Sequence, residues 1–105
     1  MSRSEREKGA RGEREVAAIL RAHGFECERT PNSGGLQVKG DLAGSFPAHV
    51  EVKFQETARP WAYWEQASNE APIGLMPVVA FRRKRSPWLA IVKLEDLAEL
   101  MARQS

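Results

Sequence analysis

Cysteine is scarce in this sequence, and long apolar runs are missing. Cys27 is the only cysteine among 105 residues, so an internal disulfide, a cysteine zinc cluster and a secreted disulfide framework are excluded. No apolar stretch approaches the roughly 20 residues that cross a bilayer. The N-terminal segment is too charged for a signal peptide. We therefore expect an intracellular protein in a reducing cytoplasm, with no membrane partner.

A large excess of charge of one sign is also missing. The 16 Lys and Arg residues against 14 Asp and Glu residues give a net charge of +2, which permits nucleic acid as a partner without requiring it. The distribution says more, because basic residues gather near the N-terminus and in one uninterrupted run. The residues predicted to contact DNA phosphates are Arg11, Arg14, Lys39, Arg82, Arg83, Lys84 and Arg85.

The length and the 42% hydrophobic content suit one domain, residues 1–105, with a single modest core. Periodicity and turn residues predict an α/β chain in the order αβββαββα. Predicted helices cover residues 5–23, 61–70 and 95–103, and predicted strands cover residues 25–29, 41–43, 48–54, 77–81 and 88–93. The apolar stripe of the last helix consists of Leu94, Leu97, Ala98 and Met101.

Glu13 is the carboxylate of the first helix that we expect to face inward. It stands one turn before the apolar residues Val16 and Leu20, whereas Glu15 projects toward the margin of the same stripe. A buried carboxylate needs a partner. Glu13 is therefore a candidate site residue.

The second and third strands are predicted to pair as a hairpin. Strand alternation places His49, Glu51 and Lys53 together on the polar face of the third strand. Antiparallel pairing over a turn of this length brings Asp41 opposite Val50 or Glu51. The two carboxylates would then approach each other closely enough to share a metal ion.

This set of side chains suits the hydrolysis of a phosphodiester. A divalent metal activates water and offsets phosphate charge, and Mg²⁺ needs little protein to hold it at a substrate phosphate. Asp41, Glu51 and the backbone carbonyl of Val52 would be sufficient ligands, and Mn²⁺ would substitute. Lys53 would orient or deprotonate the water, or offset phosphate charge. The alternative is that Glu-x-Lys marks a solvated strand face with a weak ion pair.

Several short motifs occur here in one order. They are Lys8-Gly9, Gly12-Glu13-Arg14-Glu15, Gly24-Phe25, Asn32-Ser33-Gly34-Gly35, Gly40-Asp41-Leu42 and Val50-Glu51-Val52-Lys53. With them the chain resembles the PD-(D/E)XK nuclease superfamily, and within it the archaeal-type Holliday junction resolvases, which phages and some bacteria also encode. Gln66 and the closing strands and helix are similar in type but less specific.

The resemblance implies a restriction-endonuclease-like domain, in which helices flank a central mixed sheet. It implies that Glu13, Asp41 and Glu51 are metal ligands, that Lys53 is the catalytic lysine and that Ser33 is a further active-site contact. It also implies a DNA substrate, in the host cytoplasm if a phage encodes the protein. Symmetric cutting of a four-way junction needs two active sites, so a homodimer is expected.

The sequence departs from the family pattern in two ways. Gly40 precedes Asp41 where the superfamily has proline, a change that a turn tolerates and that leaves the ligand intact. The chain is also short for a resolvase, which leaves little protein to encode junction selectivity.

Aromatic and histidine residues have less specific interpretations. Trp61, Tyr63 and Trp64 are typical of a core or a subunit interface, which the Trp61 helix would supply, more than of base stacking. His23 and His49 are expected to be structural, although His49 shares the face of Glu51.

Three other functions remain open. One is another nuclease of the superfamily that nicks or cuts duplex, flapped or damaged DNA. A second is a DNA-binding module without catalysis, and a third is an interaction protein unrelated to DNA.

Overall fold

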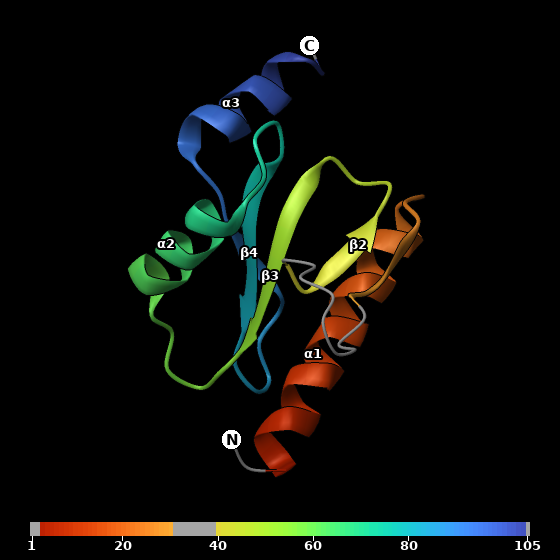
Figure 1. The fold of residues 1–105 in the computed structure, drawn as a ribbon, viewed down its shortest axis with the longest axis vertical. Helices are drawn as coiled ribbons and strands as arrows, with labels where there is room; N and C mark the ends of the chain where they lie inside the picture. Colours follow the sequence, from red (N-terminus) through yellow and green to blue (C-terminus); the bar gives the residue numbers. More distant parts are fainter. Residues whose placement is uncertain (1–2, 31–39, 105) are drawn as a thin grey trace.

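The computed structural model describes residues 3–30 and 40–104 (Figure 1). The elements along this part of the chain are α1 (Arg3–Ala22), β1 (Cys27–Arg29), β2 (Leu42–Gly44), β3 (Ala48–Phe54), α2 (Pro60–Glu70), β4 (Met76–Arg82), β5 (Leu89–Ile91) and α3 (Leu94–Ala102). The predicted order αβββαββα and the α/β class are confirmed, and the element boundaries differ from prediction by only a few residues.

Strands β3, β4 and β5 form a mixed sheet in that order. Strands β3 and β4 run parallel over their full length, and β5 pairs antiparallel with β4. A parallel pair needs a long crossover connection, which α2 supplies. Pro60 lies in the first turn of α2, where its missing N–H costs no helical hydrogen bond. The mixed sheet flanked by helices is therefore as expected.

The predicted hairpin between β2 and β3 is wrong. Strand β2 pairs antiparallel with β1 in a separate two-stranded sheet. The turn after β2 is held to the start of β1, because the backbone of Ser45 donates to the carbonyl of Glu26 and its hydroxyl accepts from the Glu26 N–H, each at 2.9 Å. Phe46 in this turn is buried in the core. These contacts direct β2 away from β3.

The two faces of the mixed sheet carry different helices (Figure 1). Val50 faces α1 and belongs to one core cluster with Val16 and Ala17. Phe54 packs against the ring of Trp88 near Gly12 of α1. Helix α1 comes so close that a Cβ at Gly12 would lie 3.2 Å from the Cβ of Phe54. A side chain at this position would require its neighbours to shift by a few tenths of an ångström, so glycine suits the close approach of α1 to the sheet.

Helix α2 covers the opposite face. Tyr63 and Ala67 are buried there against Val79 of β4, and the Tyr63 hydroxyl donates to the Gln55 side chain. Tyr63 is thus a core residue, as its type indicates, whereas Trp61 of the same helix is 78% exposed. The face of β3 that was expected to be polar lies under α2 and is buried.

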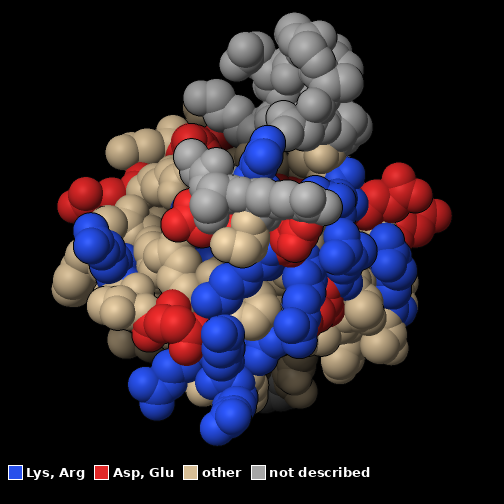
Figure 2. Space-filling view, turned by 90° about the horizontal axis from the view of Figure 1, so that it is seen from below, with Lys and Arg blue, Asp and Glu red and all other residues tan. Residues whose placement is uncertain are grey.

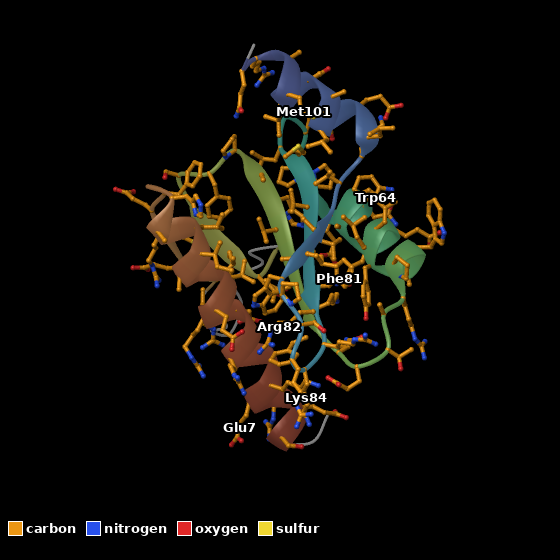
Figure 3. All side chains as sticks on the ribbon, turned by 180° about the vertical axis from the view of Figure 1, so that it is seen from behind. Glu7, Trp64, Phe81, Arg82, Lys84 and Met101 are labelled. Carbon is orange, nitrogen blue, oxygen red and sulfur yellow. The ribbon has the colours of Figure 1, made fainter. Side chains whose placement is uncertain are left out.

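Helix α3 lies at one end of the molecule, where Figure 3 shows Met101, and is remote from Lys84 at the other end. Within the described chain, no α3 side chain is buried. Leu94 is 72% exposed and Met101 58% exposed, and Leu97 and Leu100 are also exposed. The apolar stripe predicted for this helix exists, but it has no cover in a single chain.

Across residues 3–30 and 40–104, none of the helices is long and apolar enough to cross a membrane.

Candidate active site

Asp41 is fixed against the free edge of β3 by two hydrogen bonds. Its backbone N–H donates to the carbonyl of Val50 at 2.9 Å, and its carboxylate oxygen Oδ2 accepts from the N–H of Val52 at 2.6 Å. The hairpin is wrong, but the predicted neighbour of Asp41 is correct. One hydrogen-bonded residue, and not a strand ladder, brings Asp41 to β3.

Gly40 explains why proline is missing before this aspartate. Its φ of +89° lies in a region that proline cannot adopt and other L-residues rarely do. A Cβ at Gly40 would also lie 3.0 Å from the ring carbon Cε1 of His49. Glycine therefore provides both the turn into Asp41 and the space for the imidazole.

Glu51 lies on the α2 side of β3 and is only 3% exposed. Its Oε1 lies 3.0 Å from Nε2 of His49, which is 4% exposed, and it also hydrogen-bonds to Glu70. Burial, the Glu70 hydrogen bond and the charge of Asp41 together raise the pKa of the Glu51 carboxyl to about 8. The alternative of a solvated Glu-x-Lys face is therefore wrong for Glu51.

Lys53 points to the same side of β3, two residues beyond Glu51. Its ammonium donates to Oε1 of Gln66 on α2 at 2.7 Å, and it lies 5.7 Å from the centre of the Tyr63 ring. The positive charge of Lys53 opposes the rise in the pKa of Glu51, although burial outweighs it. Gln66 is thus a positioning residue for Lys53.

Glu13 has a different partner. Its Oε1 accepts from Nε of Arg29 on β1 at 2.9 Å, and its side chain is 22% exposed. Arg29 pairs with Leu42, the residue after Asp41, and Thr30 donates to the carbonyl of Asp41 at 3.0 Å. The Glu13 ion pair therefore lies beside the start of β2, which Asp41 precedes. Ser33 and Lys39 lie outside the described residues.

The sequence patterns do not predict Glu70 as a site residue, and they predict a structural role for His49. Donor atoms of His49, Glu51 and Glu70 all lie within 4.8 Å of one another. Glu70 ends α2, 19 positions after Glu51, and no local motif marks it. Only the β3–α2–β4 crossover brings it to β3. For His49, the signal was its position on the same strand face as Glu51.

The donors present fit a divalent cation. Carboxylate oxygens are the ligands that Mg²⁺ and Mn²⁺ take in proteins, and an imidazole nitrogen suits the transition metals. A cation would also oppose the rise in the pKa of Glu51 that burial and the neighbouring carboxylates cause, because a positive charge favours the ionised carboxylate.

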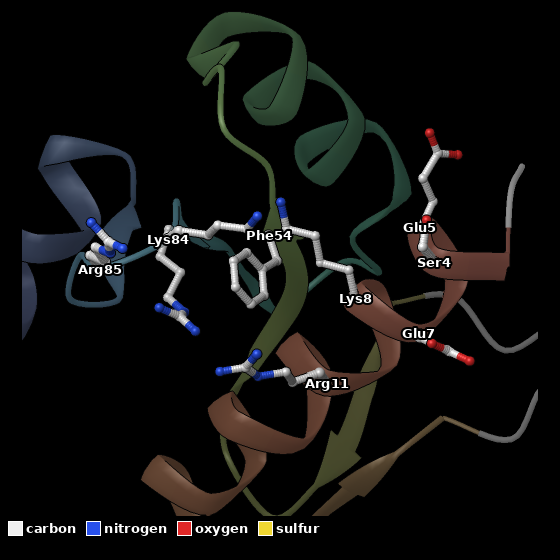
Figure 4. A pocket seen from close by; sticks show the side chains of 9 residues that line it. Ser4, Glu5, Glu7, Lys8, Arg11, Phe54, Lys84 and Arg85 are labelled. Carbon is white, nitrogen blue, oxygen red and sulfur yellow. The ribbon is translucent and has the colours of Figure 1, made fainter.

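A basic pocket lies on the α1 side of the sheet, below Phe54. It is open, has a volume of about 750 Å³, and is lined by cations from α1, from the end of β4 and from the β4–β5 turn (Figure 4). These cations are Lys8, Arg11, Arg82, Lys84 and Arg85. Lys and Arg side chains gather over this end of the molecule (Figure 2).

The cations of the pocket differ in how far they are engaged. Arg82 is paired with Glu15 at 3.1 Å, stacks 4.1 Å from the Phe54 ring centre and is 12% exposed, so it holds the pocket together. Lys8 pairs with Glu56 at 3.1 Å and Arg11 with Glu15 at 2.8 Å.

In contrast, Lys84 and Arg85 are exposed at the turn, and neither side chain makes a salt bridge to any described residue. Arg14 on α1 and Arg83 beside Lys84 are exposed as well. Among the residues predicted to contact DNA phosphates, these exposed cations are therefore more accessible to a phosphate than Arg82 is.

The chain is similar to known proteins in three comparisons. The model of the phage PDDEXK endonuclease family matches residues 4–105. Protein D14 of Escherichia phage T5 is 31% identical, over 91% of this chain and 75% of that protein. The solved structure of Hjc, a Holliday junction resolvase from Archaeoglobus fulgidus, has a similar fold, with a TM-score of 0.62 and 23% identity over 80% of this chain and 76% of that chain. The chain therefore belongs to the phage PDDEXK endonuclease family.

Proposed function

We propose that this chain is a Mg²⁺-dependent DNA endonuclease that makes paired cuts in four-way junctions in the host cytoplasm. The observation that supports it most is the position of Asp41. Its carboxylate is bound to the backbone of β3 beside Glu51, and Lys53 follows on the same strand. The name of the archaeal neighbour, a Holliday junction resolvase, supports a branched substrate.

In this proposal Asp41, Glu51 and the carbonyl of Val52 hold the cation. When bound, the cation supplies charge stabilisation at the phosphate and lowers the pKa of water. Asp41 stays in place because the Val52 N–H holds it. Lys53, anchored by Gln66, orients the attacking water or offsets phosphate charge. Glu13 contributes from the α1 side if Arg29 releases it.

Asp41→Asn tests the class of function. We expect the wild type to cut a synthetic four-way junction with Mg²⁺ at two symmetric positions, and faster than flap or linear duplex DNA. Asp41→Asn should lower the rate at least about 100-fold, because one ligand loses its charge. The asparagine oxygen still accepts from the Val52 N–H, so the fold is retained. Asp96→Asn, on α3, is the matched control.

The same assay separates the alternatives. If the protein prefers to cut flap or duplex DNA, it is another nuclease of the superfamily and not a junction resolvase. If the wild type cuts nothing with Mg²⁺ or Mn²⁺ but binds DNA as well as Asp41→Asn does, a binding module is the better description. Negligible binding even at low salt would favour an interaction protein unrelated to DNA.

The exposed cations of the β4–β5 turn and α1 are proposed to contact DNA phosphates. We expect Lys84→Ala to weaken binding to all DNA sequences alike and to reduce the slope of log affinity against log salt by about one. The backbone N–H of Lys84, which donates to Glu56 at 3.1 Å, is retained in alanine. Lys93→Ala, an exposed lysine next to α3, should leave the slope unchanged, and equal effects of the two variants would refute the contact.

The exposed face of α3 is proposed to form the homodimer. A helix of nine residues is too short to be stable by itself in water, so a covered apolar face is needed. We expect a dimer in sedimentation equilibrium, and Met101→Glu should raise its dissociation constant at least about tenfold through the cost of burying a charge. Trp61→Ala should leave the dimer intact. The reverse pattern would place the interface on α2.

A further inference from the structure

The buried polar side chains beside α2 include two residues that the proposed function does not use. They are His49 and Glu70, which lie next to Glu51. His49 and Glu51 lie two residues apart on β3 and are 4% and 3% exposed, and Glu70 reaches them from the end of α2. The His49 ring also lies beside Gly40, the residue that precedes Asp41.

The spacing of these three side chains is close to that of a metal site. A cation bound at about 2.0–2.3 Å from each donor keeps its donors about 3–4.5 Å apart. The nitrogen and the two carboxylate oxygens here lie within 4.8 Å of one another. Glu70 is only half-buried, which leaves an entry path from the α2 side.

The donor set differs from the all-oxygen set that Mg²⁺ prefers. Imidazole nitrogen strengthens binding of first-row transition-metal ions and does little for Mg²⁺, which dehydrates reluctantly. Gly40 leaves the space that the ring of His49 occupies, since a Cβ at this position would lie 3.0 Å from Cε1. The Nε2 atom of His49 lies 3.0 Å from Oε1 of Glu51, and His49 is only 4% exposed.

We propose that His49, Glu51 and Glu70 form a cation position that binds Mn²⁺ in preference to Mg²⁺ and shares the Glu51 carboxylate with the Asp41 side. This proposal rests on the proposed function only through Glu51, which is a ligand in both sets of residues. The ordinary alternative is a hydrogen-bonded cluster that merely fastens α2 to β3.

Pulsed EPR of Mn²⁺ bound to the full chain tests the proposal directly. We expect nitrogen modulation from a coordinated imidazole, and its pattern should change when the protein is labelled with ¹⁵N-histidine. This measurement needs no substitution, so it does not depend on the folding of a variant. If Mn²⁺ does not bind, or binds without nitrogen modulation, the proposal is wrong.

Calorimetric titration of Mn²⁺ and Mg²⁺ provides the second measurement. His49→Gln should weaken Mn²⁺ binding at least about tenfold and Mg²⁺ binding much less, because it removes the imidazole but leaves an amide to bond Glu51. His23→Gln changes the other histidine, which is exposed and bonded to the carbonyl of Ile19. It should preserve both affinities and the nitrogen modulation.

Glu70→Gln should weaken Mn²⁺ binding while the nitrogen modulation remains. The proposal would be overturned if His49→Gln and His23→Gln weakened Mn²⁺ binding equally. It would also be overturned if His49→Gln weakened Mn²⁺ and Mg²⁺ binding equally. Junction cleavage with Mg²⁺ is measured in parallel. If the protein cuts the junction but bound Mn²⁺ shows no nitrogen modulation, only the cation position at His49 is refuted. If bound Mn²⁺ shows nitrogen modulation but the protein cuts no DNA, only the nuclease function is refuted.

Discussion

Lys53→Ala should lower the single-turnover rate of DNA cleavage by about 10²–10⁴-fold, the range typical of a positioned proton-transfer or charge-stabilising group. DNA affinity should change little, because Gln66 of α2 engages the ammonium and Lys53 is separate from the exposed cations of α1 and the β4–β5 turn. Single-turnover cleavage and an equilibrium binding titration on the same junction measure the two effects separately. Cleavage at the wild-type rate would remove Lys53 from the mechanism.

Two further variants refine this result. Lys53→Arg should restore little activity, since a guanidinium does not deprotonate near neutral pH and its planar fork differs from a compact ammonium. Gln66→Ala should lower the rate less than Lys53→Ala does, because it removes the anchor but retains the amine. A loss in Gln66→Ala that exceeds the loss in Lys53→Ala would give Gln66 a role of its own.

Glu51→Gln should stabilise the metal-free protein above neutral pH while it abolishes cleavage. Burial, the hydrogen bond with Glu70 and the charge of Asp41 raise the pKa of Glu51 to about 8, from 4.5 in an unperturbed carboxyl. The folded state thus binds a proton that the unfolded state has lost between these pH values. The resulting stability is present in full below about 4.5 and is lost as pH rises through about 8.

Urea unfolding in EDTA between pH 5.5 and 8.5 measures this effect. The wild type should lose on the order of 3 kcal/mol across this window, whereas Glu51→Gln, which resembles the protonated carboxyl, should lose much less. Burial raises the pKa of Glu15, but hydrogen bonds from Arg11 and Trp88 and the charge of Arg82 outweigh it and lower this pKa. Glu15 therefore titrates below the window. Parallel slopes for wild type and variant would contradict the assignment.

Metal removal provides the complementary observation. Binding a cation must release the proton of Glu51, so the apparent affinity for metal should rise by up to roughly tenfold per pH unit below about pH 8. Proton release measured by calorimetry in two buffers would test it.

The elements of this protein follow from local patterns. The alternation of His49, Val50 and Glu51 assigned the two faces of β3 correctly, because side chains in a strand alternate whatever the strand pairs with. Pro60 marked the start of α2 in the same local way. The pairing of β2 was not local. It depends on Ser45 bonding to Glu26, 19 positions away.

What the sequence alone determined is the order of the helices and strands and the placement of Glu51 and Lys53 on one strand face. These are short-range consequences of backbone geometry. Only the tertiary structure decided that α2 buries this face, because a parallel β3–β4 pair needs a crossover helix. This burial raises the pKa of Glu51, and the same crossover brings Glu70 to His49.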